Sequence, residues 1–201
     1  MIVDPTSADP REIAKLLTSV VLPRPIAFVS TLSLEGVPNL APFSYFTVAS
    51  STPPVLCFAP IVRRDGTKKD TLLNIEATRE FVVNIVSEDI AAKMNVCSGE
   101  YPPDVNEFAV SGLTPVASDL VKAPRVRESH VNMECRLLQI VEVSSKPGGG
   151  SLVLGEVVRF HVDGDILKGD TVDPGKLRAV GRMGGATYAR TTDRFDLERP
   201  K

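Results

Sequence analysis

The sequence predicts a mainly β protein, a closed or split antiparallel barrel with a few peripheral helices. Segments of strand length predominate along the 201 residues, helical patterns are few, and strand and helix do not alternate regularly. A parallel, doubly wound sheet requires that alternation, so its absence favours antiparallel pairing. The length suffices for one full hydrophobic core, and we expect residues 1–201 to form a single domain.

Local signals place the elements of the first half of the chain. Asp9 as a capping residue and Pro10 at the first helical position predict a short amphipathic helix at the start. Two further helices are expected, one from Asp70 and one from Ser87 to near Gly99. Apolar runs of strand length predict strands at residues 26–31, 39–46, 55–59 and 81–86.

The second half begins with a long segment, residues 101–124, that is rich in proline and turn formers. It predicts an ordered loop of a length that is often functional or covers an interface. Residues 130–143 alternate between apolar and polar side chains, which predicts a half-exposed antiparallel strand. A glycine-rich hairpin loop at 147–150 leads to a strand at 152–162, and Asp163-Gly164 predicts a tight turn.

Composition excludes several classes of partner. The formal net charge is −2, and the absence of a basic stripe argues against nucleic acid. The chain has no apolar run long enough to cross a membrane and no signal-peptide pattern at its start, so we expect a soluble protein of the cytoplasm. Its three cysteines, Cys57, Cys97 and Cys135, lie in apolar surroundings and are expected to be buried thiols in a reducing compartment.

Metal and nucleophilic chemistry are poorly supported. The chain has two histidines, His130 and His161, on the polar faces of predicted strands, and no paired cysteines, so we expect no metal. It has no Gly-x-Ser-x-Gly elbow, which argues against a hydrolase triad. Neither Gly148–Ser151 nor Gly181–Gly185 has the strand-before, helix-after context of a nucleotide-binding loop. We therefore assign no catalytic residue.

Hydroxyl and amide side chains gather where two predicted strands meet a turn. The first strand closes in Ser30 and Thr31, and the second, Asn39 to Ser44, contains Pro42, which is tolerated mainly on an edge strand or at a bulge. We expect the backbone N–H groups near Pro42 to be free to hold a flat heterocycle with polar edges. An irregular edge strand with internally satisfied hydroxyls fits the same pattern, and the spacing alone favours it.

The best candidate for an anion site is Lys68-Lys69-Asp70-Thr71, at the start of a predicted helix. Unpaired N–H groups and the positive end of the helix dipole favour an anion there. Alternatively, Asp70 caps the helix while both lysines are solvated, and the residues alone weigh the two interpretations equally. A heterocycle at residues 39–44, hydroxyls at 30–31 and a monophosphate at Lys69 and Thr71 together correspond to the parts of FMN.

Several motifs, in order along nearly the whole chain, resemble the flavin reductase-like family that includes flavoredoxin. They are Pro23-Arg24-Pro25-Ile26-Ala27, Asn39 to Ser44, Pro53-Pro54, Lys69-Asp70-Thr71, Glu107-Phe108, and Arg182 to Gly185 with Tyr188. The resemblance implies an FMN-binding split barrel of Greek-key topology that forms homodimers with FMN near the subunit interface. It also implies a set of cofactor-binding residues: Ser30, Thr31, Asn39, Ala41, Pro42, Phe43, Ser44, Ser50, Lys69, Asp70 and Thr71.

The resemblance implies an oxidoreductase in which NADH or NADPH reduces bound FMN, which then passes electrons to an acceptor. Such chemistry belongs to the cofactor, while the protein positions it. A second hypothesis is a flavoredoxin-type electron carrier that does not use NADH or NADPH. A third and weaker hypothesis is an interaction module that has lost its flavin.

Overall fold

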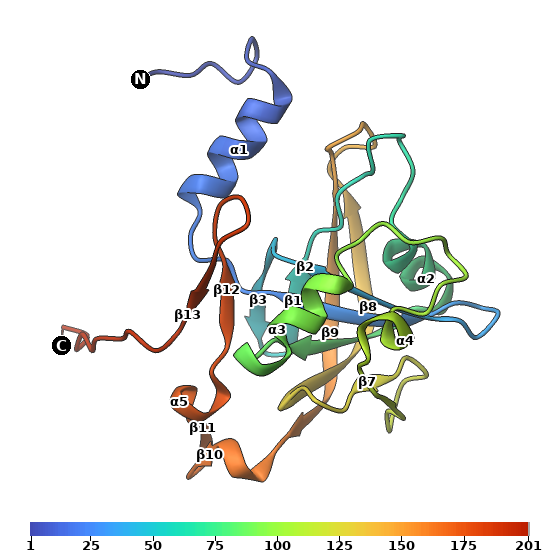
Figure 1. Cartoon of the computed structure of the whole chain (residues 1–201), viewed down its shortest axis with the longest axis vertical. Coiled ribbons are helices and arrows are strands. Elements are labelled where there is room, and N and C mark those ends of the chain that lie inside the picture. The colour runs from blue at the N-terminus through green and yellow to red at the C-terminus, as the bar shows by residue number, and fades with distance from the viewer. Residues whose placement is uncertain (201) are drawn as a thin grey trace.

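A seven-stranded antiparallel sheet dominates the computed structural model, which describes residues 1–200 (Figure 1). The spatial order of its strands is β2 (Pro38–Phe43), β1 (Ala27–Leu32), β5 (Glu80–Ile85), β8 (Val131–Glu142), β9 (Ser151–Val162), β4 (Pro54–Phe58) and β3 (Phe46–Ser51). All six pairings between neighbours are antiparallel. The prediction of a mainly β, antiparallel fold is confirmed.

The two edge strands of the sheet, β2 and β3, follow each other directly in the chain. Ser44 and Tyr45 alone connect them, so the end of β2 and the start of β3 lie within about 11 Å of each other. The sheet must therefore curl until its two edges approach, although no ladder of hydrogen bonds joins them. Pro42 lies on one of these edges, as predicted.

A cluster of apolar side chains fills the inside of the curled sheet. The ring centroid of Phe58 lies 5.2 Å from that of Phe43 and 5.5 Å from that of Phe81. Gly155 on β9 faces this cluster, and a Cβ atom there would overlap the Phe81 ring. A residue without a side chain is thus required for β9 to pass Phe81.

The helices and short strands lie outside the main sheet. The helices are α1 (Pro10–Val20), α2 (Asp70–Thr78), α3 (Ala91–Val96), α4 (Glu107–Ser111) and α5 (Pro174–Leu177). The short strands pair as β6 (Pro115–Val116) with β7 (Arg125–Val126), β10 (Leu167–Lys168) with β11 (Thr171–Val172), and β12 (Val180–Arg182) with β13 (Tyr188–Arg190). Helix α1 has no buried residue and stands clear of the barrel, beside the turn of the β12–β13 hairpin (Figure 1). In residues 1–200 no helix has the length and apolar character that a membrane crossing requires.

One local expectation is confirmed and another needs correction. Asp163 starts a tight turn, in which Ile166 N–H donates to the Asp163 carbonyl oxygen at 3.3 Å, and the short 3₁₀ helix at Gly164–Ile166 buries Ile166. The strand at 130–143 is not half-exposed along its whole length, because Asn132 and Glu134 on its polar face are buried. The loop at 117–126 covers that face.

All three cysteines are free thiols, as expected, with Cys97 and Cys135 buried and Cys57 half-buried. Burial raises the pKa of the Cys97 thiol to about 11. The thiol is thus protonated and unreactive at neutral pH.

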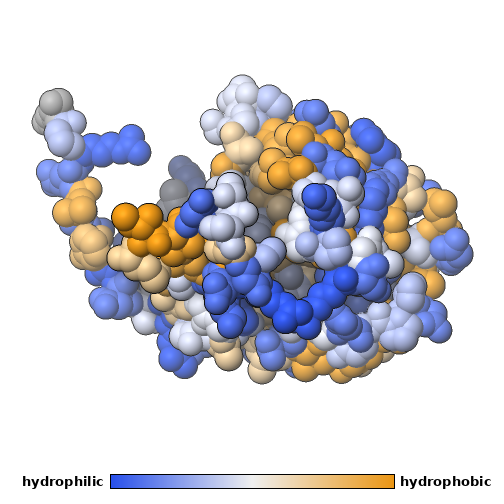
Figure 2. All heavy atoms as spheres, turned by 90° about the horizontal axis from the view of Figure 1, so that it is seen from above, coloured by the Kyte–Doolittle hydropathy of each residue, from blue (hydrophilic) through white to orange (hydrophobic). Residues whose placement is uncertain are grey.

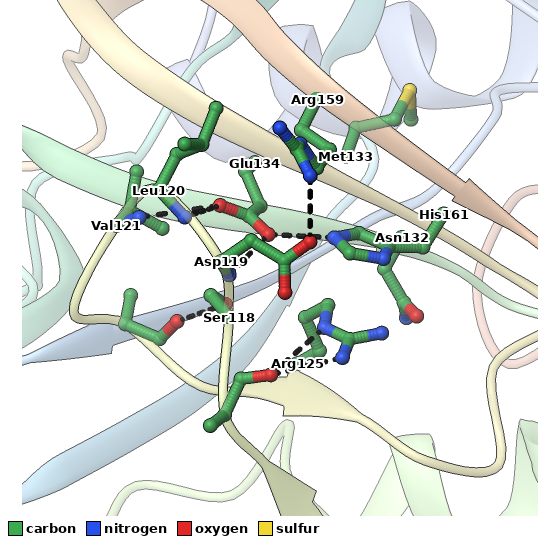
Figure 3. Close-up of polar contacts among 12 residues, drawn as sticks. Ser118, Asp119, Leu120, Val121, Arg125, Asn132, Met133, Glu134, Arg159 and His161 are labelled. Atoms are coloured by element: carbon green, nitrogen blue, oxygen red, sulfur yellow. Dashed lines mark hydrogen bonds and ion pairs between the residues drawn. The ribbon is translucent and has the colours of Figure 1, made fainter.

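Glu134 fastens the covering loop to the sheet (Figure 3). Its carboxylate accepts hydrogen bonds from the backbone N–H groups of Asp119, Leu120 and Val121, at 2.8, 2.6 and 3.2 Å. His161 lies 2.6 Å from the same carboxylate, and Arg159 pairs with the Asp119 side chain. Asp119, Glu134 and His161 lie close enough for their ligand atoms to share a metal ion. These side chains already bind one another, Arg159 and the backbone of the loop, so we interpret the cluster as a structural one that holds the loop on the sheet.

The charge of Glu134 stabilises the folded state. Burial raises the pKa of its carboxyl group, but hydrogen bonds from Asp119 N–H, His161 and Leu120 N–H outweigh burial and hold the pKa below the ordinary 4.5. This stabilisation is present above pH 4.5 and is lost as the pH falls through the lower, folded-state pKa.

Replacing Glu134 with glutamine should lower the free energy of unfolding at pH 7 by about 2–3 kcal/mol, because charge-assisted hydrogen bonds are lost. Urea unfolding at pH 7 and at pH 3 measures the effect, which should shrink at the lower pH. Glu142→Gln, an exposed change on the same strand, serves as the control. A difference that stays constant with pH would contradict a role for the carboxylate charge.

Candidate functional site

A cavity of about 540 Å³ opens at the corner where β2 ends and β3 begins. Pro42, Phe43 and Ser44 line it, together with Lys69 at the start of α2. Residues of helix α1 and of the turn at 182–185 complete the lining. The cavity thus brings together segments from the beginning, middle and end of the chain.

The walls of this cavity carry positive charge. Lys15, Arg24, Lys69 and Arg182 line it, and no acidic side chain of the described residues does. Within residues 1–200, no carboxylate lies within 4.0 Å of any of these four cations. In a chain of net charge −2, such a concentration of unneutralised cations favours an anionic ligand.

Arg24 holds the walls of the cavity together from a buried position. Its guanidinium donates to the carbonyl oxygens of Thr18 and Val21 in and after α1, at 2.8 and 2.9 Å, and to that of Met183 at 3.0 Å. A longer contact of 3.4 Å reaches the Ser44 hydroxyl. These partners are neutral oxygens, so they orient the guanidinium without neutralising it.

The start of α2 provides a second cationic feature. Of the two lysines predicted here, Lys68 pairs with Glu76 at 2.6 Å, whereas Lys69 lines the cavity. Asp70 does not cap the helix: Lys69 occupies the cap position, and the Asp70 carboxylate pairs with Arg63 at 2.5 Å. The leading N–H groups of a helix have no partner within it, so this end keeps donors for an anion.

The outer edge of β2 is less open than the sequence suggested. The Leu40 N–H group donates to the Glu107 carboxylate at 3.0 Å, and Pro42 has no N–H group. Because the Leu40 N–H group points away from β1, strand alternation directs the N–H groups of Ala41 and Phe43 toward β1. The expectation of free N–H groups around Pro42 is therefore wrong for residues 40–43.

The structure separates the predicted site residues into groups. Pro42, Phe43, Ser44 and Lys69 line the large cavity. A smaller adjoining cavity, of about 80 Å³, is lined by Asn39, Ala41, Asp70 and Thr71, and shares Pro42, Phe43 and Lys69 with the large one. Eight of the eleven predicted residues therefore surround one continuous region.

The remaining three, Ser30, Thr31 and Ser50, line neither cavity. Ser30 is fully buried and donates to the Pro124 carbonyl at 2.5 Å, so it holds the covering loop. Thr31 is also fully buried, 3.4 Å from the Asn39 side chain. Ser50 lies on β3 and accepts a hydrogen bond from Thr52 N–H.

Sequence reasoning missed the basic residues outside the Lys69 segment. Lys15, Arg24 and Arg182 converge on the cavity from three distant segments. Arg24, between two prolines, and Arg182, in the closing motif, were seen only as parts of the resemblance. Arg182 also stacks over the Tyr188 ring, 4.5 Å from its centroid.

Comparisons with known proteins agree with this architecture. The model of the family described as "Flavin reductase like domain" matches residues 19–180. Nitrilotriacetate monooxygenase component B from Bacillus cereus is 33% identical, with a TM-score of 0.93 and 98% of each chain covered. The 2-nitrobenzoate 2-nitroreductase NbaA of Pseudomonas fluorescens is 32% identical, with a TM-score of 0.89 over 100% of this chain and 96% of the other.

A protein with a split barrel domain from Shewanella frigidimarina shows the same fold. Its structure has a TM-score of 0.85 at 23% identity, and all of each chain is covered. The curled sheet described above, open between β2 and β3, is therefore a split barrel, as predicted.

Proposed function

The chain belongs to the flavin reductase-like family, and on that premise we propose that it is an FMN-dependent oxidoreductase reduced by NADH or NADPH. Electrons would pass from the bound flavin to an acceptor. The observation that carries this proposal is the cavity at the β2–β3 corner, with four cations and no acidic residue in its lining. FMN is an anion of a size suited to such a cavity.

The residues present fit the parts of FMN. Lys69 and the leading N–H groups of α2 would hold the phosphate, since both lack a negative partner within the described chain. The apolar side chains of Pro42 and Phe43, with the polar Ser44 next to them in the lining, would support the ring. Bound FMN would supply the electron-transfer chemistry, and the protein would bind, orient and shield it.

One observation favours a flavoredoxin-type carrier as the second candidate. The glycine-rich turn at 183–187 joins β12 to β13, so it lacks the strand-to-helix geometry of a nicotinamide dinucleotide site. A reductase would then have to bind NADH or NADPH transiently at the open cavity. A carrier would not need that step.

Visible absorption of the purified protein, mixed with FMN and then anaerobically with NADH or NADPH, separates these functions. We expect flavin absorbance that bleaches with a pyridine nucleotide. Bleaching by dithionite alone would identify the carrier. A protein that cannot retain any flavin would contradict both functions.

Replacing Lys69 with alanine should weaken FMN binding by about 10- to 100-fold, because one charge-assisted contact to the phosphate is lost. Riboflavin has no phosphate, so its affinity should change little. Fluorescence titration with both ligands measures the ratio. Lys68→Ala is the matched control, since Lys68 is paired with Glu76. Equal losses for FMN and riboflavin would place the phosphate elsewhere.

We also propose that the protein is a homodimer, which exposed apolar residues support. Leu17, Val20 and Val21 on and after α1 are each more than half exposed. Figure 2 shows the C-terminal segment as an arm standing clear of the body, and Phe195 and Leu197 within it are each 83% exposed. Isolated single-chain domains rarely leave such groups of apolar side chains in water.

Sedimentation velocity at micromolar concentration should give the mass of a dimer. Leu17→Asp together with Val21→Asp should shift the protein toward the monomer, because charged groups would enter the apolar contact. Leu34→Asp, a change at an exposed turn residue, should leave the mass unchanged. A monomeric wild-type protein would contradict the proposal.

A further inference from the structure

Glu107 is a buried carboxylate directly behind the candidate site. It opens α4, within the long loop at 101–124, and is only 7% exposed. One of its oxygens accepts from the Asn39 side-chain amide at 2.7 Å, and the other from Leu40 N–H at 3.0 Å. No basic side chain of the described residues pairs with it. The carboxylate therefore accepts the backbone hydrogen bond of Leu40 that a neighbouring strand would accept if β2 were not at the edge of the sheet.

The charge state of Glu107 determines the orientation of the Asn39 side-chain amide, that is, which partner its NH₂ group faces and which its oxygen faces. An ionised carboxylate only accepts hydrogen bonds, so Asn39 must present its NH₂ group to Glu107. Its Oδ1 atom then faces the opposite way, where it accepts from the Thr71 hydroxyl at 2.7 Å. Thr71 is 1% exposed and lies in the first turn of α2. A directed chain of hydrogen bonds thus runs from Thr71 through Asn39 to Glu107.

This chain joins two elements that meet at the candidate site. Asn39 belongs to β2, which lines the large cavity farther along at Phe43. Thr71 belongs to α2, whose cap residue Lys69 also lines that cavity. The Thr71 proton points to Asn39, so this hydroxyl is committed to the protein rather than offered to a ligand.

We propose that Glu107 is a positioning residue of the flavin site, which holds β2 and the start of α2 in a fixed relation through Asn39. The inference rests on the proposed FMN binding. Glu107 acts without touching the ligand, by setting the direction of every hydrogen bond in the chain. Buried polar groups with this connectivity rigidify their surroundings when all members are satisfied.

Glu107→Gln tests the direction of the chain. Its NH₂ group would face the NH₂ group of Asn39, so two donors would meet. If the Asn39 amide turned over instead, the Thr71 hydroxyl would lose its acceptor, so either arrangement weakens the link between β2 and α2. Affinity for FMN and for riboflavin should both fall by about tenfold or more, as for loss of a buried hydrogen bond. Removal of the negative charge alone would instead strengthen FMN binding and leave riboflavin binding unchanged.

The double variant Glu107→Gln with Asn39→Asp should restore binding. The carboxylate introduced on β2 would accept from the new glutamine and from Thr71, and the glutamine oxygen would still accept from Leu40 N–H. Every hydrogen bond and the total charge are then recovered. We expect both affinities to return to within about threefold of the wild type. If Glu107→Gln weakened binding by a route other than the hydrogen bond to Asn39, a change at position 39 would not restore the affinity.

Glu142→Gln is the control, because Glu142 is exposed and lines neither cavity. Thermal unfolding of each variant without flavin shows which of them fold. If the wild type binds no flavin, the proposed function fails; if it binds flavin and Glu107→Gln binds equally well, the positioning role fails. A double variant that folds without regaining affinity overturns the role even where the single variant does not fold.

Discussion

The two-residue connection between β2 and β3 is the constraint on which the rest of the structure depends. Ser44 and Tyr45 bring the two edges of one sheet together at a single corner, while the edges elsewhere remain unbonded. A sheet with an open edge must cover or satisfy its unpaired backbone groups. Here Pro42 removes one donor and Glu107 accepts from another. The cavity opens at the corner itself, where the strands part and no other strand can pair.

The need to satisfy unpaired backbone groups also explains the polar side chains on the central strands. Ser30, Asn84 and Glu134 are buried polar residues on three neighbouring strands, and each binds the backbone of the segment at 117–126. The Asn84 carbonyl oxygen, for example, accepts from Val126 N–H at 3.0 Å. An irregular segment lying on a sheet would bury unpaired backbone groups without such partners. The long loop is therefore ordered because the sheet supplies the hydrogen bonds that the loop cannot make within itself.

Local chemistry made much of the fold predictable, and distance in sequence limited the rest. Asp9 and Pro10 mark the start of α1 through interactions within a few residues, and Pro42 marks an edge strand through the donor it lacks. By contrast, Asn39 and Glu107 are 68 residues apart, and no local pattern indicates that they meet. Ser30 shows the ambiguity most clearly, because a hydroxyl that closes a strand looks the same whether it meets a ligand or a loop. The positive charge of the cavity could not be predicted from the sequence for a similar reason, since its four cations come from separate segments.

The two cavities at the site differ in the charge of the residues that line them. Every charged residue that lines the large cavity is a cation, whereas the adjoining small cavity is lined by Asp70, Glu100 and Glu107 as well as by Arg63 and Lys69. Asp70 is neutralised by Arg63, and burial raises the pKa of Glu107, an effect that the hydrogen bonds from Leu40 and Asn39 only partly oppose. The large cavity therefore attracts an anionic group more strongly than the small cavity does. Lys69 lines both cavities together with Pro42 and Phe43, so it is the one charged residue of their shared lining, where a ligand that is charged at one end and neutral at the other would be oriented.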